Sequence, residues 1–132
     1  MKVPIKSGIV IISIWKPFSL WRHIGIVSIE NGIAYIYDND PDNPENNGGG
    51  SIGKFKIYDW LKNRDVLEFY DSELSTSKIK KQVNKYWDKK FNWVTFNCRT
   101  FVKKITNKPV LIKKPTGISI LDNLFYIENR TE

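Results

Sequence analysis

The sequence is poor in the residues that build disulfides and metal sites. Its 132 residues include one cysteine and one histidine. One cysteine excludes an intramolecular disulfide, and one histidine beside it supplies too few ligands for a structural zinc site. We therefore expect a chemistry that needs neither a metal nor a cofactor.

Long hydrophobic runs are also missing. The longest, residues 8–15, is far too short to cross a bilayer. Only Lys2 and Lys6 precede it, and no small-residue cleavage site follows, so it does not read as a secretory leader. The sequence predicts no transmembrane segment. It predicts a protein that is cytoplasmic or exported without a recognisable signal peptide.

Positive charge is plentiful, with a net charge of +7. The basic residues are spread over residues 78–90 and 99–114 without a recognised nucleic-acid motif. This distribution disfavours nucleic acid as the partner. Attraction to an anionic surface, such as lipid headgroups or a cell-wall polymer, explains the charge equally well, and so does an acidic protein partner.

The length and the hydrophobic content of 41% predict one domain that spans residues 1–132 and has its own core. Strands are expected at residues 8–15, 21–29, 33–38, 54–57 and 65–70, with a turn at residues 16–19, a hairpin turn at Asn31-Gly32 and a helical turn at residues 58–62. Helices are expected from Ser75 or Ser77 to about Lys89 and from Cys98 to Thr106. Residues 39–51 should form a mobile surface loop, residues 91–96 an extended segment, and most of residues 108–132 a tail packed on the domain. The fold class is then α+β, with a small antiparallel sheet of four to six strands packed against the two helices.

Cys98 has the sequence context of a nucleophile. Asn97 is a natural N-cap, so Cys98 should lie in the first turn of a helix, where free N–H groups and the helix dipole favour a thiolate. Arg99 adds a positive charge beside it, and Asn97 supports the helix start. The same N–H groups could bind an oxyanion. A lone cysteine is more often a small buried hydrophobic residue than a nucleophile, so the residues around Cys98 have to distinguish the two roles.

His23 is the candidate base because the chain has no other histidine. Pairing across the Asn31-Gly32 turn sets His23 opposite Asp40 and Gly25 opposite Asp38, with these side chains on one face. A carboxylate there could hold the imidazole in its useful tautomer. Asp38 is our choice, with Asp40 or Asn39 as alternatives. Equally, these residues could simply begin the polar loop, and a lone histidine is often structural.

The ordered motifs resemble a known group of thiol enzymes. They are a Gly-led strand at residues 8–14, Arg-His-Ile-Gly-Ile at residues 22–26, the Asn31-Gly32 turn, and Asn-Cys-Arg-Thr-Phe at residues 97–101. Together they resemble the lecithin:retinol acyltransferase-like group, which are circularly permuted members of the NlpC-type papain-like superfamily. The resemblance covers about residues 5–105. It implies a permuted papain-like fold in which His23 is the base and Cys98 forms an acyl-enzyme.

Two departures from that group bear on the substrate. Ile36 stands where the acyltransferases usually carry a second histidine, and Arg99-Thr100 replaces a Glu-His pair after the cysteine. The first implies that the role of the second histidine passes to Asp38 or Asp40, and the second weakens assignment to the lipid-acting branch. The sequence therefore favours a cysteine peptidase or amidase that acts on a peptide, amide or acyl-ester substrate, with acyl transfer as a variant. The alternatives are a catalytically idle binding module that holds an anionic partner, and a permuted papain-like protease that removes ubiquitin-type modifiers.

Overall fold

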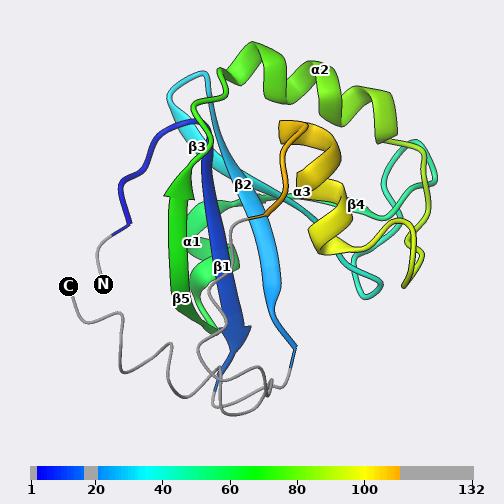
Figure 1. Cartoon of the computed structure of the whole chain (residues 1–132), viewed down its shortest axis with the longest axis horizontal. Coiled ribbons are helices and arrows are strands. Elements are labelled where there is room, and N and C mark those ends of the chain that lie inside the picture. The colour runs from blue at the N-terminus through cyan, green and yellow to red at the C-terminus, as the bar shows by residue number, and fades with distance from the viewer. Residues whose placement is uncertain (1–2, 17–20, 111–132) are drawn as a thin grey trace.

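A five-stranded antiparallel sheet and three helices make up the fold, which confirms the expected α+β class (Figure 1). The computed structural model describes residues 3–16 and 21–110. In chain order the elements are β1 (Ile9–Trp15), β2 (His23–Glu30), β3 (Ile33–Asn39), β4 (Ile52–Lys56), α1 (Ile57–Leu61), β5 (Arg64–Asp71), α2 (Thr76–Tyr86) and α3 (Cys98–Thr106). The expected turn after β1 and the tail beyond Val110 lie outside the described residues.

Helices cover both faces of the sheet, whose strand order is β4-β3-β2-β1-β5. Figure 1 shows α2 and α3 on one face and α1 on the other. The two hydrophobic clusters follow this division, because successive side chains of a strand point to opposite faces. One cluster joins Ile24 and Ile26 of β2 to Phe101 of α3. The other joins Val27 and its neighbours to Trp60 of α1.

The hairpin between β2 and β3 has the predicted turn and register. Asn31 and Gly32 have φ values of 51° and 77°, which suit a two-residue type I′ turn. The pairing runs from Glu30 opposite Ile33 to Gly25 opposite Asp38. Gly25 has to be a glycine, because a Cβ there would lie 2.7 Å from the Ile36 side chain. The hairpin thus fixes which residues of β3 lie beside the start of β2.

Both long helices begin where their caps predict. The Ser75 hydroxyl accepts a hydrogen bond from the Lys78 N–H, and the Asn97 side chain accepts one from the Thr100 N–H. The Thr100 hydroxyl in turn accepts from the Asn97 N–H, which completes a capping box. α2 ends at Tyr86, one turn before the expected Lys89.

The segment between α2 and α3 differs from the expected extended segment. Asn92 and Phe96 exchange two backbone hydrogen bonds of 2.9 Å, which closes a tight turn. The Asn92 carboxamide oxygen accepts from the N–H groups of Val94 and Thr95. An Asn side chain that bonds its own following backbone favours a turn over a strand, which is the reason that the extended prediction is wrong.

The polar loop at residues 39–51 packs against the domain. The Asn46 amide donates to the carbonyl oxygens of Ile52 and Trp87. Its oxygen accepts from the N–H groups of Gly48 and Gly50. One half-buried amide thus organises a loop for which composition alone indicates only mobility.

Within residues 3–16 and 21–110, no helix is long and apolar enough to cross a membrane.

Glu30, at the hairpin end of β2, is a buried carboxylate with a full set of partners. It accepts from the Ser28 and Tyr37 hydroxyls and from the Lys54 ammonium, at 2.9, 2.7 and 2.8 Å. Burial alone would raise the pKa of Glu30, but these hydrogen bonds together hold it below its ordinary value. The ionised form therefore stabilises the fold.

We expect Glu30→Gln to lower the free energy of unfolding at pH 7 by about 1–3 kcal/mol, because hydrogen bonds to a charged group are lost. Since the folded pKa lies below the unfolded value of about 4.3, this contribution is present above that value and disappears as the pH falls through the folded pKa. Urea unfolding at pH 7 and about pH 3 measures both effects. Glu45→Gln, the same change at an exposed position, is the control. Equal losses in the two variants at pH 7 would contradict this account.

Candidate functional site

The site forms where β3 leaves β2. In the described residues the β2–β3 ladder ends at Gly25 opposite Asp38, so the backbone of residues 22–24 lies beyond it. The Cys98 thiol lies against this backbone and donates to the Arg22 carbonyl oxygen at 3.7 Å. It also accepts a backbone hydrogen bond from Ile24. The sulfur therefore contacts the residues on both sides of His23.

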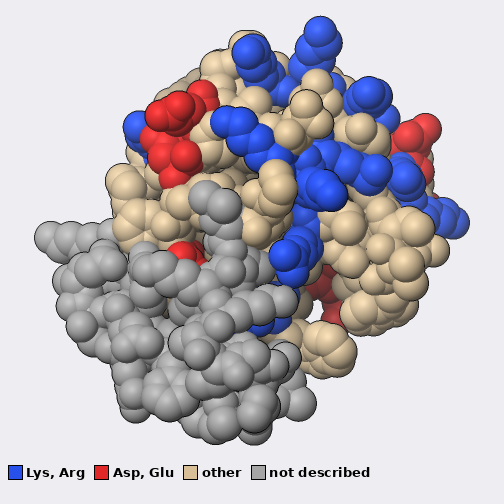
Figure 2. Space-filling model, in the orientation of Figure 1, with Lys and Arg blue, Asp and Glu red and all other residues tan. Residues whose placement is uncertain are grey.

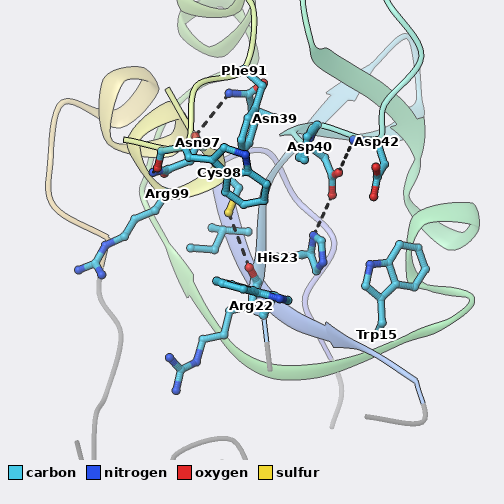
Figure 3. Close-up of a pocket in the computed structure, with 14 residues that line it drawn as sticks. Trp15, Arg22, His23, Asn39, Asp40, Asp42, Phe91, Asn97, Cys98 and Arg99 are labelled. Carbon is cyan, nitrogen blue, oxygen red and sulfur yellow. Dashed lines mark hydrogen bonds and ion pairs between the residues drawn. The ribbon is translucent and has the colours of Figure 1, made fainter. Parts of the chain in front are cut away.

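Asn39, the last residue of β3, holds the start of α3 in this position. Its amide donates to the carbonyl oxygen of Phe96 at 2.8 Å. It also donates to that of Asn97 at 3.5 Å (Figure 3). The Asn39 side chain is fully buried, so these bonds are shielded from water. The β3 strand and the helix that carries Cys98 are thus joined by one side chain.

His23 and Asp40 form a direct pair. The His23 Nδ1 atom lies 2.9 Å from a carboxylate oxygen of Asp40, and both side chains are largely buried. Burial alone would raise the pKa of Asp40, but the hydrogen bonds from His23 and the Asp42 N–H and the charges of His23 and Arg64 hold it below its ordinary value. The Trp15 ring meets the imidazole edge-on, with 5.7 Å between ring centroids. His23 is therefore oriented from two sides.

Asp38, our first choice for the third member, does not contact His23. Its carboxylate accepts from the Trp60 indole N–H at 2.7 Å and from the Asn43 amide at 2.8 Å. Burial raises the pKa of Asp38, although these hydrogen bonds and the Arg64 charge oppose the shift. Asp40, one of the two alternatives to Asp38, is the carboxylate that contacts His23, and it directly follows β3. Asn39, the other alternative, belongs to the scaffold of α3.

The expected lowering of the Cys98 pKa is wrong in direction. Burial raises the pKa of the thiol, and the negative charges of Asp38 and Asp40 add to the rise. Backbone hydrogen bonds from Ile24 and Arg99 act in the opposite direction. The helix start does supply N–H groups to the sulfur, but desolvation outweighs them, and the free thiol is protonated near neutral pH.

Asn97 and Arg99 support the site through the backbone. Both ends of the Asn97 amide are engaged, its oxygen by Thr100 N–H and its nitrogen by the Trp93 carbonyl. The Arg99 side chain is exposed and extends away from the sulfur, whereas its N–H bonds to it (Figure 3). The positive charge that Arg99 was expected to bring therefore lies outside the immediate contact of the thiol.

A cavity of about 710 Å³ gathers these residues. Several aromatic side chains form its walls. Trp21 and Trp93 lie 6.2 Å apart between centroids, and Phe91 meets Trp93 edge-on at 4.9 Å. The residues that line the cavity are Trp15, Trp21, Arg22, His23, Ile24, Asn39, Asp40, Pro41, Asp42, Phe91, Trp93, Asn97, Cys98 and Arg99. The cavity thus combines one thiol, one imidazole–carboxylate pair and apolar walls.

Sequence reasoning missed Trp15 and Arg64. Trp15 ends β1 and Arg64 begins β5, and the two residues are partners in the sheet. Residues this distant in sequence meet through strand order, which the chain pattern does not reveal. In the described part of the chain, no group of three His, Cys, Asp or Glu residues is placed to hold a metal ion.

Comparisons with protein-family models, with curated proteins and with solved structures found no match. The resemblance to the acyltransferase-like group stays a prediction.

The two acidic residues should respond differently to amide substitution. We expect Asp40→Asn to slow alkylation of Cys98 by iodoacetamide at neutral pH by about ten- to a hundredfold, because a hydrogen bond to a charged group worth about 1.5–3 kcal/mol is lost from the imidazolium. Asp38→Asn should lower the melting temperature, since an amide cannot accept both buried N–H donors, and should change the alkylation rate less. Alkylation rates and melting curves measured on both variants show which carboxylate is the partner of His23. The reverse ranking of the two alkylation rates would restore Asp38 as the partner of His23.

Proposed function

We propose that this protein is a cysteine-dependent hydrolase of the amidase or peptidase type. The observation that carries the proposal is that Cys98 lies against the backbone on both sides of His23, while His23 is paired with Asp40 in the same cavity. A nucleophile, a base and an orienting carboxylate are the three parts of a catalytic triad. The permuted papain-like fold, with histidine before cysteine in the chain, belongs to the same proposal.

The proposed reaction steps follow from which nitrogen of His23 is already hydrogen-bonded. Asp40 engages Nδ1 of His23, which leaves Nε2 to take the Cys98 proton. The sulfur then attacks the carbonyl carbon. The oxyanion accepts from the N–H of Cys98 and from that of Arg99, which bonds to the sulfur in the free protein. As the C–N bond breaks, His23 returns the proton to the leaving amine. Water, activated by His23, hydrolyses the thioester and frees the thiol.

Because the Cys98 thiol is protonated in the free protein, its proton has to move to His23 during the reaction. Because burial raises the pKa of Cys98, the free enzyme does not hold a stable thiolate. The transfer to His23 accompanies attack on the substrate, as general-base catalysis requires. A carboxylate on the far side of the imidazole stabilises the imidazolium that forms. An acceptor other than water would make the same thioester the intermediate of an acyl transfer.

The walls of the cavity bear on the substrate. Trp21 and Trp93 are 69% and 68% exposed, so large apolar surfaces face the solvent beside the nucleophile. Aromatic side chains supply contact area at low entropic cost, which suits a substrate with a bulky apolar group near the scissile bond. We therefore expect an amide or ester of that kind to react faster than a glycyl analogue.

Alkylation of the free thiol tests the proposal on the intact protein. Since Cys98 is the only cysteine, every alkylated molecule is modified at the candidate nucleophile. We expect the rate with iodoacetamide to rise with pH through a midpoint above the ordinary thiol value of about 8.5, because burial raises the pKa of Cys98. His23→Ala should slow the reaction at neutral pH by about tenfold or more, since the base is lost.

Cys98→Ser is the blank for this measurement, and melting curves show that His23→Ala is folded. A thiol that reacts only after unfolding would identify Cys98 as a structural residue and would falsify the enzyme proposal. A folded His23→Ala variant that reacts as fast as the wild type would remove His23 from the mechanism.

Trp93→Ala tests the aromatic wall separately from the chemistry. With a series of reactive amides or esters, we expect KM for bulky apolar substrates to rise about threefold to tenfold, because roughly 1 kcal/mol of apolar contact is lost. The alkylation rate with the small reagent iodoacetamide should stay within about twofold. Val94→Ala, an 80% exposed neighbour outside the cavity lining, is the matched control. An equal rise in KM for the glycyl substrate would show that Trp93 supports the site rather than selecting the substrate.

The second candidate function is a catalytically idle module that binds an anionic partner. Residues 75–110 contain ten of the 21 Lys and Arg residues but one of the 14 acidic residues. Figure 2 shows many of these basic side chains over α2 and α3. A face of one charge attracts an anionic surface whether or not the thiol reacts. The His23 dependence of the alkylation rate separates the two candidates.

A further inference from the structure

Arg64 is a buried cation behind the candidate site. It begins β5 opposite Trp15 of β1 and is 7% exposed. Its guanidinium carbon lies 3.9 Å from the centroid of the Trp15 ring and 4.1 Å from that of the Trp60 ring. Contacts of a guanidinium with two aromatic rings contribute about 2 kcal/mol or more each when they are desolvated.

Each of the two rings contacts one residue at or near the candidate site. Trp15 meets His23 edge-on, and the Trp60 indole N–H donates to Asp38. Arg64 is therefore separated from the imidazole by one ring and from the buried carboxylate by another. A change in its position would move both rings.

The burial of Arg64 is costly if its role is only structural. Among the described residues, its Nε and Nη1 atoms have no hydrogen-bond partner. No carboxylate of those residues forms an ion pair with it within 4.0 Å. Removing a cation from water costs several kcal/mol, and an apolar residue of similar size is often more stable in such a place. A charge retained under these conditions points to a role in the site.

We propose that Arg64 is a positioning residue of the active site. Through Trp15 it fixes the orientation of His23, and its charge balances Asp38 and Asp40 so that a thiolate can form at Cys98. This inference rests on the proposed function, because it assigns Arg64 a part in the reaction of Cys98 and His23.

The electrostatics around the thiol agree with this role. Asp38 and Asp40 both disfavour the thiolate. The positive charge of Arg64 interacts favourably with both carboxylates and lowers the pKa of each. The negative charge of ionised Cys98 in turn raises the pKa of Arg64, so the two charges stabilise one another. The charged or titratable groups around the site are Arg22 just before β2, His23 of β2, Asp38 of β3, Asp40 and Asp42 of the following loop, Arg64 of β5, and Cys98 and Arg99 of α3.

Two variants separate the charge of Arg64 from its shape. Arg64→Gln keeps a planar group between the rings but removes the charge. We expect it to raise the pH midpoint of Cys98 alkylation by about 0.5–1 unit, the order of effect of one charge that does not contact the sulfur, at an effective dielectric constant of about 20. Arg64→Lys keeps the charge but loses the planar contacts. It should leave the midpoint near that of the wild type and slow alkylation at neutral pH by about threefold or more.

Lys62→Gln, an exposed position in the turn before β5, controls for the loss of one unit of net charge. Melting curves are measured for each variant to show that it is folded. If Arg64→Gln does not fold, the alkylation rate of Arg64→Lys tests the role of Arg64 instead. A lower melting temperature with the wild-type midpoint and rate in both variants would overturn the inference and leave Arg64 a structural residue. The wild-type protein then still shows alkylation that depends on His23, which distinguishes this failure from failure of the proposed function.

Discussion

The site depends on the separation of β3 from β2 after the Gly25–Asp38 pair. A strand that ends its pairing leaves backbone N–H and C=O groups that need other partners. Here the Cys98 thiol takes that position, with Arg22 and Ile24 as its partners. Asn39 makes the arrangement possible, since its amide bonds to the loop before α3. One interruption of a ladder thus sets the candidate nucleophile beside the strand that carries His23.

Opposing electrostatic effects on Cys98 determine the protonation state of its thiol. A helix N-terminus favours a thiolate, but burial and two carboxylates act against it, and burial is the largest effect. Asp40 disfavours the thiolate and also pairs with His23, which in the proposed mechanism takes the proton of the thiol. The balance suits a thiol that stays protonated until a substrate arrives. The negative charges of Asp38 and Asp40 also give a buried cation, Arg64, the role proposed above, which is to balance these charges.

Local patterns predicted most of the fold. The Asn31-Gly32 turn and the caps at Ser75 and Asn97 were readable because each depends on residues close in sequence. The same turn predicts the register up to Gly25 opposite Asp38, and Asp40, two residues further along, contacts His23 through its side chain. That Asp38 instead contacts Trp60 and Asn43 could not be predicted, because the sequence does not give the position of these segments in space. The raised pKa of Cys98 was missed for the same reason, since burial is a property of the whole fold.

The central claim is that Cys98 forms a covalent acyl intermediate with the help of His23. Intact-protein mass spectrometry after rapid mixing with a reactive ester tests it most directly. The account predicts a transient mass increase equal to the acyl group, located by peptide mapping on Cys98, absent in Cys98→Ser and formed more slowly in His23→Ala. The account is contradicted if the folded wild-type protein gains no mass while the substrate is consumed, or if Cys98→Ser consumes it at the same rate.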